Sequence, residues 1–317
     1  MNFFTATGSI SDYMLLLPKA NIYAGTGFGY NYWFNLSWGG TNVDTVQPVI
    51  PLSQSEHPRA GFAINSFNIN FGGGQCTSGC NGLVVWAFSN NLQASGSPGS
   101  EFSAVRINTT TTYTFPAQAN EPGCPNCIDT NDVRIFGTPS YHAGVISASL
   151  NTNGPDHHSH TLWFQVQPAL NDNDPRCTGS FVNLCPQVTA ARILNEDCFF
   201  CGGQGTNGST FFGTLMPNIA GDLTMVFNYS DDHIFPETAY VSRRATQTVN
   251  TMHDSGFVLC GGAASYSQGR WGDYTATAGD LTSLTQDFVW FSGMNSIAGG
   301  NWGTCVGANG FTAGNQP

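Results

Sequence analysis

Charged side chains are scarce in this sequence, and basic ones are the scarcest. Only 9% of the 317 residues are charged, and 9 Lys and Arg stand against 20 Asp and Glu, so the formal net charge is −11. Proteins that bind nucleic acid or anionic membrane surfaces need clusters of basic side chains to neutralise phosphates. The composition therefore argues against both kinds of partner.

Long apolar runs and long helical patterns are also missing. No stretch is long enough to span a bilayer, so we expect no membrane insertion. The first residues lack the basic segment and continuous apolar core of a signal peptide. We therefore expect that export information was removed or that the chain is part of a longer product. The best helical pattern, Ala190–Leu194, is too short to define a helical element.

Short apolar runs separated by Gly, Asn, Pro or Asp fill the sequence instead, and Asn21–Ala24 is one of them. About sixteen to twenty such runs, about 8–15 residues apart, predict an all-β fold: a sandwich, a β-helix or a β-propeller. No tight rung-length repeat is evident, whereas units of about 40–50 residues suit four-stranded blades. Because no linker divides the chain, we predict a single β-propeller domain over residues 1–317. It would have about six or seven four-stranded blades, a set that this chain need not contain in full.

The ten cysteines mostly lie near one another in the sequence. Five disulfides in an oxidising compartment are the first interpretation, and they predict an extracellular or cell-surface location. The alternative is a zinc site that uses the four thiolates of Cys-Pro-Asn-Cys and Cys-Phe-Phe-Cys. These two segments lie about seventy residues apart and the other cysteines also need partners, so we predict disulfides. The simplest pairs are Cys76–Cys80, Cys124–Cys127, Cys177–Cys185, Cys198–Cys201 and Cys260–Cys305.

Four Asn-x-Ser/Thr sequons are consistent with a secreted glycoprotein. They begin at Asn35, Asn108, Asn207 and Asn228. In a sequence so rich in Asn and Thr, several sequons are also expected by chance.

Two polar segments could hold a metal ion. Asn171-Asp172-Asn173-Asp174 places hard oxygen ligands at alternate positions, so Asp172 and Asp174 are candidate Ca²⁺ ligands, although the Gly and bidentate Glu of an EF-hand are missing. The histidines of residues 156–160 could bind a transition metal, but a solvated loop is the more ordinary interpretation. We expect no other cofactor.

The segment Arg270–Thr277 concentrates Arg, Trp and Asp in a charge-poor chain. In one interpretation Trp271 fills a gap between sheets while Arg270 and Asp273 satisfy backbone groups and each other. In the other, Arg270 and Asp273 face a ligand. We favour the structural role.

This segment and its surroundings resemble a known family. Arg270-Trp271-Gly-Asp273-Tyr274-Thr-Ala-Thr, the strand Phe288-Val-Trp and the ending Asn-Trp302-Gly-Thr are similar to the C-terminal pattern of secreted bacterial sialidase-like (BNR-type) β-propeller proteins. The resemblance extends more loosely over residues 11–308. It implies a propeller, with Arg270, Trp271, Asp273, Tyr274 and Trp302 as structural residues, and says little about activity because most members are uncharacterised.

A sialidase needs three arginines around a carboxylate, a Tyr/Glu nucleophile pair and an acid/base residue. The eight arginines and five glutamates of this chain show no such arrangement. We therefore predict a binding or structural module that recognises a glycan or a protein and could self-assemble into a filament or coat. A secreted sialidase-like glycoside hydrolase is the alternative.

Overall fold

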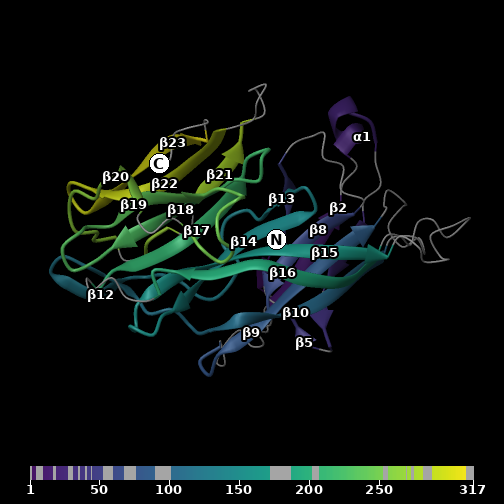
Figure 1. The fold of residues 1–317 in the computed structure, drawn as a ribbon, viewed down its shortest axis with the longest axis horizontal. Helices are drawn as coiled ribbons and strands as arrows, with labels where there is room; N and C mark the ends of the chain where they lie inside the picture. Colours follow the sequence, from purple (N-terminus) through teal and green to yellow (C-terminus); the bar gives the residue numbers. More distant parts are fainter. Residues whose placement is uncertain are drawn as a thin grey trace, which may run out of the picture.

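The computed structural model describes residues 2–4, 10–16, 19–27, 31–34, 36–39, 41–43, 45–52, 60–67, 76–89, 101–171, 187–201, 207–252, 256–268, 270–272, 275–280 and 288–311. Within these residues nearly every element is a strand (Figure 1), so the predicted all-β class is confirmed. In the same residues, no helix is long and apolar enough to cross a membrane.

Five sheets of three or more strands follow one another along the chain, except that residues 50–51 of the third sheet interrupt the second. The first sheet contains β1 (Asn2–Phe4), β2 (Ile10–Leu16) and β3 (Asn31–Phe34). The second contains β6 (Gln47–Pro48), β8 (Gly61–Ser66), β9 (Cys80–Ser89) and β10 (Glu101–Tyr113). The third contains β7 (Ile50–Pro51), β13 (Ser140–His142), β14 (Val145–Asn153), β15 (Ser159–Asn171) and β16 (Gln187–Phe199).

The fourth sheet contains β17 (Ser209–Pro217), β18 (Leu223–Ser230), β19 (Glu237–Arg243) and β20 (Phe257–Cys260). The fifth contains β21 (Ala276–Gly279), β22 (Phe288–Ile297) and β23 (Asn301–Gly310). Two small hairpins complete the described strands: β4 (Ser37–Trp38) with β5 (Thr41–Asn42), and β11 (Ala119–Glu121) with β12 (Cys124–Ile128).

One local prediction was wrong, and one segment with a weak helical pattern is a strand. Asn21–Ala24 belongs to the short helix α1 (Lys19–Ala24), where Ile22 and Tyr23 are exposed, so no buried face selects the strand conformation. Residues 190–194 lie within β16, which pairs antiparallel with β15 along its length. Pairing with a neighbouring strand outweighs a local helical preference.

Successive sheets pack face to face through separate apolar cores. Ile64 and Val85 of the second sheet meet Leu150 and Phe164 of the third in the largest core. The opposite face of the third sheet contributes Trp163 to a core shared with the fourth sheet. The fourth and fifth sheets meet in a further core that contains Met216, Val226, Val289 and Phe291. The sheets therefore form a stack in chain order, as the colours of Figure 1 show.

The earliest strands of the later sheets come together at one side of the stack. Neighbouring strands are antiparallel except for the parallel pair of β7 and β13, and β6, β17 and β21 are edge strands. Ser140 of β13 donates its hydroxyl to the Leu215 carbonyl of β17 at 3.2 Å. Thr214 of β17 in turn lies 2.8 Å, hydroxyl to hydroxyl, from Thr275, just before β21. The third, fourth and fifth sheets thus meet at this side of the stack.

The blade count stays a prediction. Among the described residues, the second and fourth sheets have the four strands expected of a blade, the third has five, and the first and fifth have three. The single domain over residues 1–317 likewise stays a prediction.

Three of the predicted cysteine pairs form disulfides: Cys76–Cys80, Cys198–Cys201 and Cys260–Cys305. The last joins β20 of the fourth sheet to β23 of the fifth. The predicted Cys124–Cys127 disulfide is wrong, because both residues are free thiols in the structure. The hairpin geometry lets the Cys127 thiol donate to the Cys124 carbonyl at 2.9 Å instead. Because Cys198 and Cys201 are joined, the four-thiolate zinc alternative is also wrong.

Trp271 is fully buried, as the structural interpretation of its segment expects. It packs with Phe211 and Phe212, and its ring meets that of Tyr266 edge-on at 4.8 Å. Its indole N–H donates to the Asn228 side-chain oxygen at 3.3 Å. Arg270, by contrast, is exposed.

Asn228 is wrong as a glycosylation site because its side chain is fully buried. Its amide donates to the Glu237 carbonyl at 3.1 Å and to the Met294 carbonyl at 2.8 Å. A glycan on this amide would find no room in the folded chain and would break the hydrogen bonds that tie the fourth sheet to the fifth.

Candidate binding cavities

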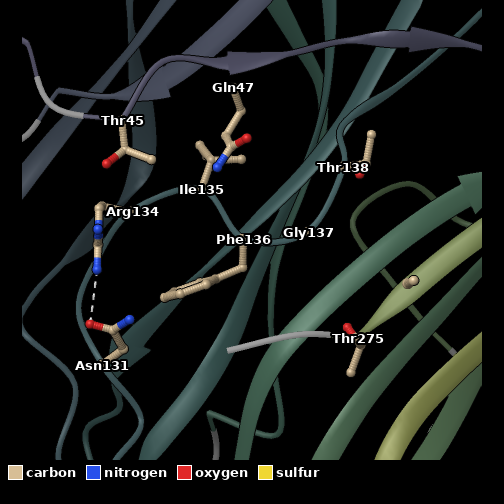
Figure 2. Close-up of a pocket in the computed structure, with 10 residues that line it drawn as sticks. Thr45, Gln47, Asn131, Arg134, Ile135, Phe136, Gly137, Thr138 and Thr275 are labelled. Atoms are coloured by element: carbon tan, nitrogen blue, oxygen red, sulfur yellow. Dashed lines mark hydrogen bonds between the residues drawn. The ribbon is translucent and has the colours of Figure 1, made fainter. Parts of the chain in front are cut away.

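A cavity of about 410 Å³ lies where the inner edges of the sheets meet. Three distant parts of the chain supply its walls (Figure 2): the start of the second sheet, the segment before β13, and the start of the fifth sheet. The lining residues are Thr45, Gln47, Asn131, Arg134, Ile135, Phe136, Gly137, Thr138, Thr275 and Ala276. We call it the central cavity.

Arg134 is the charged residue in the central cavity, and a local turn holds it. Its Nε lies 2.7 Å from Asp132 Oδ2, and its backbone N–H donates to Asp132 Oδ1 at 2.9 Å. The far end of the guanidinium donates to the Asn131 side-chain oxygen at 3.0 Å (Figure 2). Asp132 is buried, so the guanidinium is fixed in orientation and its charge is neutralised at the cavity wall.

The apolar part of the wall is rigid as well. Phe136 is buried and meets Phe212 edge-on at 5.0 Å. Gly137 has a φ of 61°, and a Cβ there would overlap the Thr214 side chain, so this position requires glycine. Thr275 is fixed by Thr214 and by donating its hydroxyl to the Phe212 carbonyl. The cavity is thus built on packed backbone, which favours a preformed site.

A second cavity of about 320 Å³ lies between the third and fourth sheets. Its lining includes His142, Gln165, Asn195 and Arg243. Arg243 is buried, and burial lowers its pKa below the ordinary value for arginine. It donates to the carbonyls of Gln247 and Thr248, both at 3.1 Å. These contacts close the turn after β19, so a structural role accounts for this side chain without a ligand.

The β11–β12 hairpin brings three potential metal ligands together. One donor atom each from Glu121, Cys124 and Cys127 lies within 4.8 Å of the others. Burial, the Cys124 thiol and the Glu121 carboxyl raise the pKa of Cys127 to about 12. A metal-free Cys127 therefore stays protonated at neutral pH, which makes it a poor nucleophile.

Glu237 has a pKa raised to about 7, chiefly by burial and also by the nearby Asp231. Its pKa is higher in the folded than in the unfolded chain, so this group stabilises the fold below about pH 4.5, and that contribution is lost as the pH rises through 7. We predict that Glu237→Gln raises the free energy of unfolding at pH 8 by about 2 kcal/mol relative to the native chain. Urea unfolding at pH 4.5, 6 and 8 measures this difference.

The increase in free energy of unfolding caused by Glu237→Gln should shrink towards zero at pH 4.5. Asp197, whose pKa burial raises to about 6, provides a matched comparison: the gain from Asp197→Asn should level off about one pH unit lower than that from Glu237→Gln. If the difference in free energy of unfolding between Glu237→Gln and the native chain is the same at pH 4.5, 6 and 8, the prediction is contradicted.

Other predicted site residues have mixed outcomes. Asn108 and Asn207 are exposed, and Asn207 donates to Asp232 at 2.7 Å, so both sequons stay predictions. Trp302 is 53% exposed and belongs to none of the apolar cores of the described residues.

The histidines of residues 156–160 differ in burial. His157 is exposed, whereas His160 is buried and its Nε2 lies 2.9 Å from Asp156 Oδ1. The remaining predicted residues lie outside the described part of the chain: Asn35, Asp172, Asp174, Cys177, Cys185, Asp273 and Tyr274.

The sequence did not predict the residues that line the central cavity. Thr275 is the exception in position alone, since it lies in the Arg270–Thr277 segment. Arg134 is one of eight arginines in a charge-poor chain, and that scarcity is the sequence signal that points to this segment. No local pattern joins residues 45–47 to residues 131–138.

No protein-family model matches the chain, and no curated protein matches it. Among solved structures, the crystal structure of a mutant levansucrase from B. megaterium is similar with a TM-score of 0.35 and 7% sequence identity, over 96% of this chain and 70% of that one. A similarity this low carries no argument about function. The resemblance to sialidase-like propellers stays a prediction.

Proposed function

We propose that this chain is an extracellular, propeller-like binding protein whose central cavity takes a neutral carbohydrate. The observation that carries the proposal is the lining of that cavity. Thr45, Thr138 and the amides of Gln47 and Asn131 offer donors and acceptors without net charge, and Phe136 adds an apolar surface. Sugar hydroxyls suit such uncharged hydrogen-bonding groups, and aromatic rings suit the apolar faces of sugars.

The same lining favours binding over hydrolysis. Glycoside hydrolysis ordinarily uses two carboxyl groups on either side of the scissile bond. Neither of the two cavities described above has an Asp or Glu in its lining, and each holds one arginine rather than three. The sialidase-like hydrolase is therefore the less favoured alternative.

The stack of sheets and the disulfides support the rest of the proposal. Sheets that pack in chain order, with their first strands at a shared inner edge, are arranged like the blades of a propeller. Disulfides persist in oxidising compartments, which supports an extracellular location. Self-assembly is a further proposal, and the exposed Trp290 and Val306 on the fifth sheet offer a surface for it.

Gln47→Ala is predicted to weaken binding of a neutral oligosaccharide about tenfold, because one hydrogen bond in a preformed site contributes about 1.4 kcal/mol. A glycan array first selects the ligand, and isothermal titration calorimetry then measures the affinity. Gln268→Ala is the matched control, since Gln268 is exposed and outside the cavity. Its affinity should equal that of the native protein.

Equal affinity of the native and Gln47→Ala proteins for the selected glycan would contradict the proposed site. A panel of chromogenic glycosides tests the alternative: turnover that is lost when one Asp or Glu is replaced would establish the hydrolase instead.

A further inference from the structure

The β11–β12 hairpin places two thiols and a carboxyl group around one point. Glu121 and Cys124 are direct cross-strand partners, joined by a turn in which Gly123 has a φ of 79°. Asn126 also has positive φ, and its N–H donates to the Asn120 side chain at 2.8 Å. The Cys127 thiol lies 2.9 Å from the Cys124 carbonyl. The donor atoms of Glu121, Cys124 and Cys127 consequently lie within 4.8 Å of one another.

This spacing is close to what one zinc ion requires. With Zn–S bonds of about 2.3 Å and Zn–O bonds of about 2.1 Å at tetrahedral angles, neighbouring ligand atoms lie about 3.5–3.8 Å apart. Cys127 Sγ and Glu121 Oε1 already lie 3.7 Å apart, so only small side-chain rotations would be needed for the other donor pairs. Cys124 and Cys127 are half-buried, so solvent can reach the fourth coordination position.

Glu121 gives an independent reason to expect a cation. It is 2% exposed, and no basic side chain among the described residues forms an ion pair with it. Its Oε2 accepts the Tyr266 backbone N–H at 2.9 Å, while Oε1 faces the Cys127 sulfur at 3.7 Å. A buried carboxylate without a counter-charge is costly, and a divalent ion between Oε1 and the thiolates would supply that charge.

The oxidation state of the other cysteines also supports a metal site at Cys124 and Cys127. All six of the other cysteines that the structure describes are in disulfides, whereas Cys124 and Cys127 are free. Thiolates select soft or borderline metals such as zinc over calcium or magnesium.

We propose that Glu121, Cys124 and Cys127 form a zinc site, with solvent as the fourth ligand. The site is structural in effect. Glu121 holds the Tyr266 backbone, and Cys127 packs against the core that contains Trp271. Zinc would therefore fasten the hairpin to the segment that precedes the fifth sheet.

The test uses the full chain, purified without reductant, stripped with a chelator and reloaded with Zn²⁺ or Co²⁺ alone. We expect one ion per chain by elemental analysis and, with Co²⁺, the near-ultraviolet absorption of cobalt–thiolate bonds. Cys124→Ser/Cys127→Ser should abolish the ion and that absorption, and Glu121→Gln should weaken binding at least tenfold. Cys76→Ser/Cys80→Ser is the matched control and should keep the ion.

Three results would overturn the site: a Cys124–Cys127 disulfide in the mass of the native protein, no bound ion although both thiols are reduced, or bound Co²⁺ without thiolate absorption. The spectrum of the native protein decides the case even where a cysteine variant fails to fold. Carbohydrate binding at the central cavity is measured separately, so failure of one proposal leaves the other intact.

Discussion

Trp271→Ala is expected to lower the free energy of unfolding by about 3–5 kcal/mol, among the largest effects of any single replacement in this chain. The side chain is fully buried against Phe211, Phe212 and Tyr266. Its loss would leave a large cavity and remove the indole N–H that donates a hydrogen bond to the Asn228 side-chain oxygen. Because Asn228 also bonds the fifth sheet through Met294, the damage would reach the contact between two sheets. Chemical denaturation followed by circular dichroism measures the change.

Trp302→Ala is the control for Trp271→Ala. Both tryptophans belong to the pattern that resembles the sialidase-like family, but Trp302 is 53% exposed. Its replacement should change the free energy of unfolding by no more than about 0.5 kcal/mol. Similar losses for the two variants would show that the pattern, rather than burial, governs stability, and would contradict the structural account of Trp271.

Removing the Cys260–Cys305 disulfide is expected to cost about 4 kcal/mol. The bond closes a loop with a sequence separation of 45, and the entropy that a cross-link removes from the unfolded chain grows with loop length. It also joins the edge strands β20 and β23 of two different sheets. The double variant Cys260→Ser/Cys305→Ser leaves no unpaired thiol behind, and its unfolding is compared with that of the native protein without reductant.

The short disulfide Cys76–Cys80 provides the comparison for loop length. Its sequence separation is 4, so the same relation gives only about 2 kcal/mol for Cys76→Ser/Cys80→Ser. A loss from the short loop equal to or greater than that from the long one would contradict the entropic account.

The all-β class could be predicted from the sequence because strand patterns are local. Short apolar runs broken by turn residues need only period and spacing to be recognised, and the pairs Cys76–Cys80 and Cys198–Cys201 are equally local. The local pattern misled at residues 21–24, where the expected strand is a short helix whose Ile22 and Tyr23 are exposed.

The tertiary structure alone decided which chemistry-bearing residues meet. Asn228 has a correct sequon, but its burial between two sheets follows from packing that no tripeptide encodes. Cys124 and Cys127 have a spacing that suits either a disulfide or a metal, and the hairpin that adds Glu121 makes the difference. The central cavity joins residues 45–47, 131–138 and 275–276, which the packing of separate sheets brings together. Sheet stacking is set by long-range contacts, whereas sequence patterns report only which face of each strand is apolar.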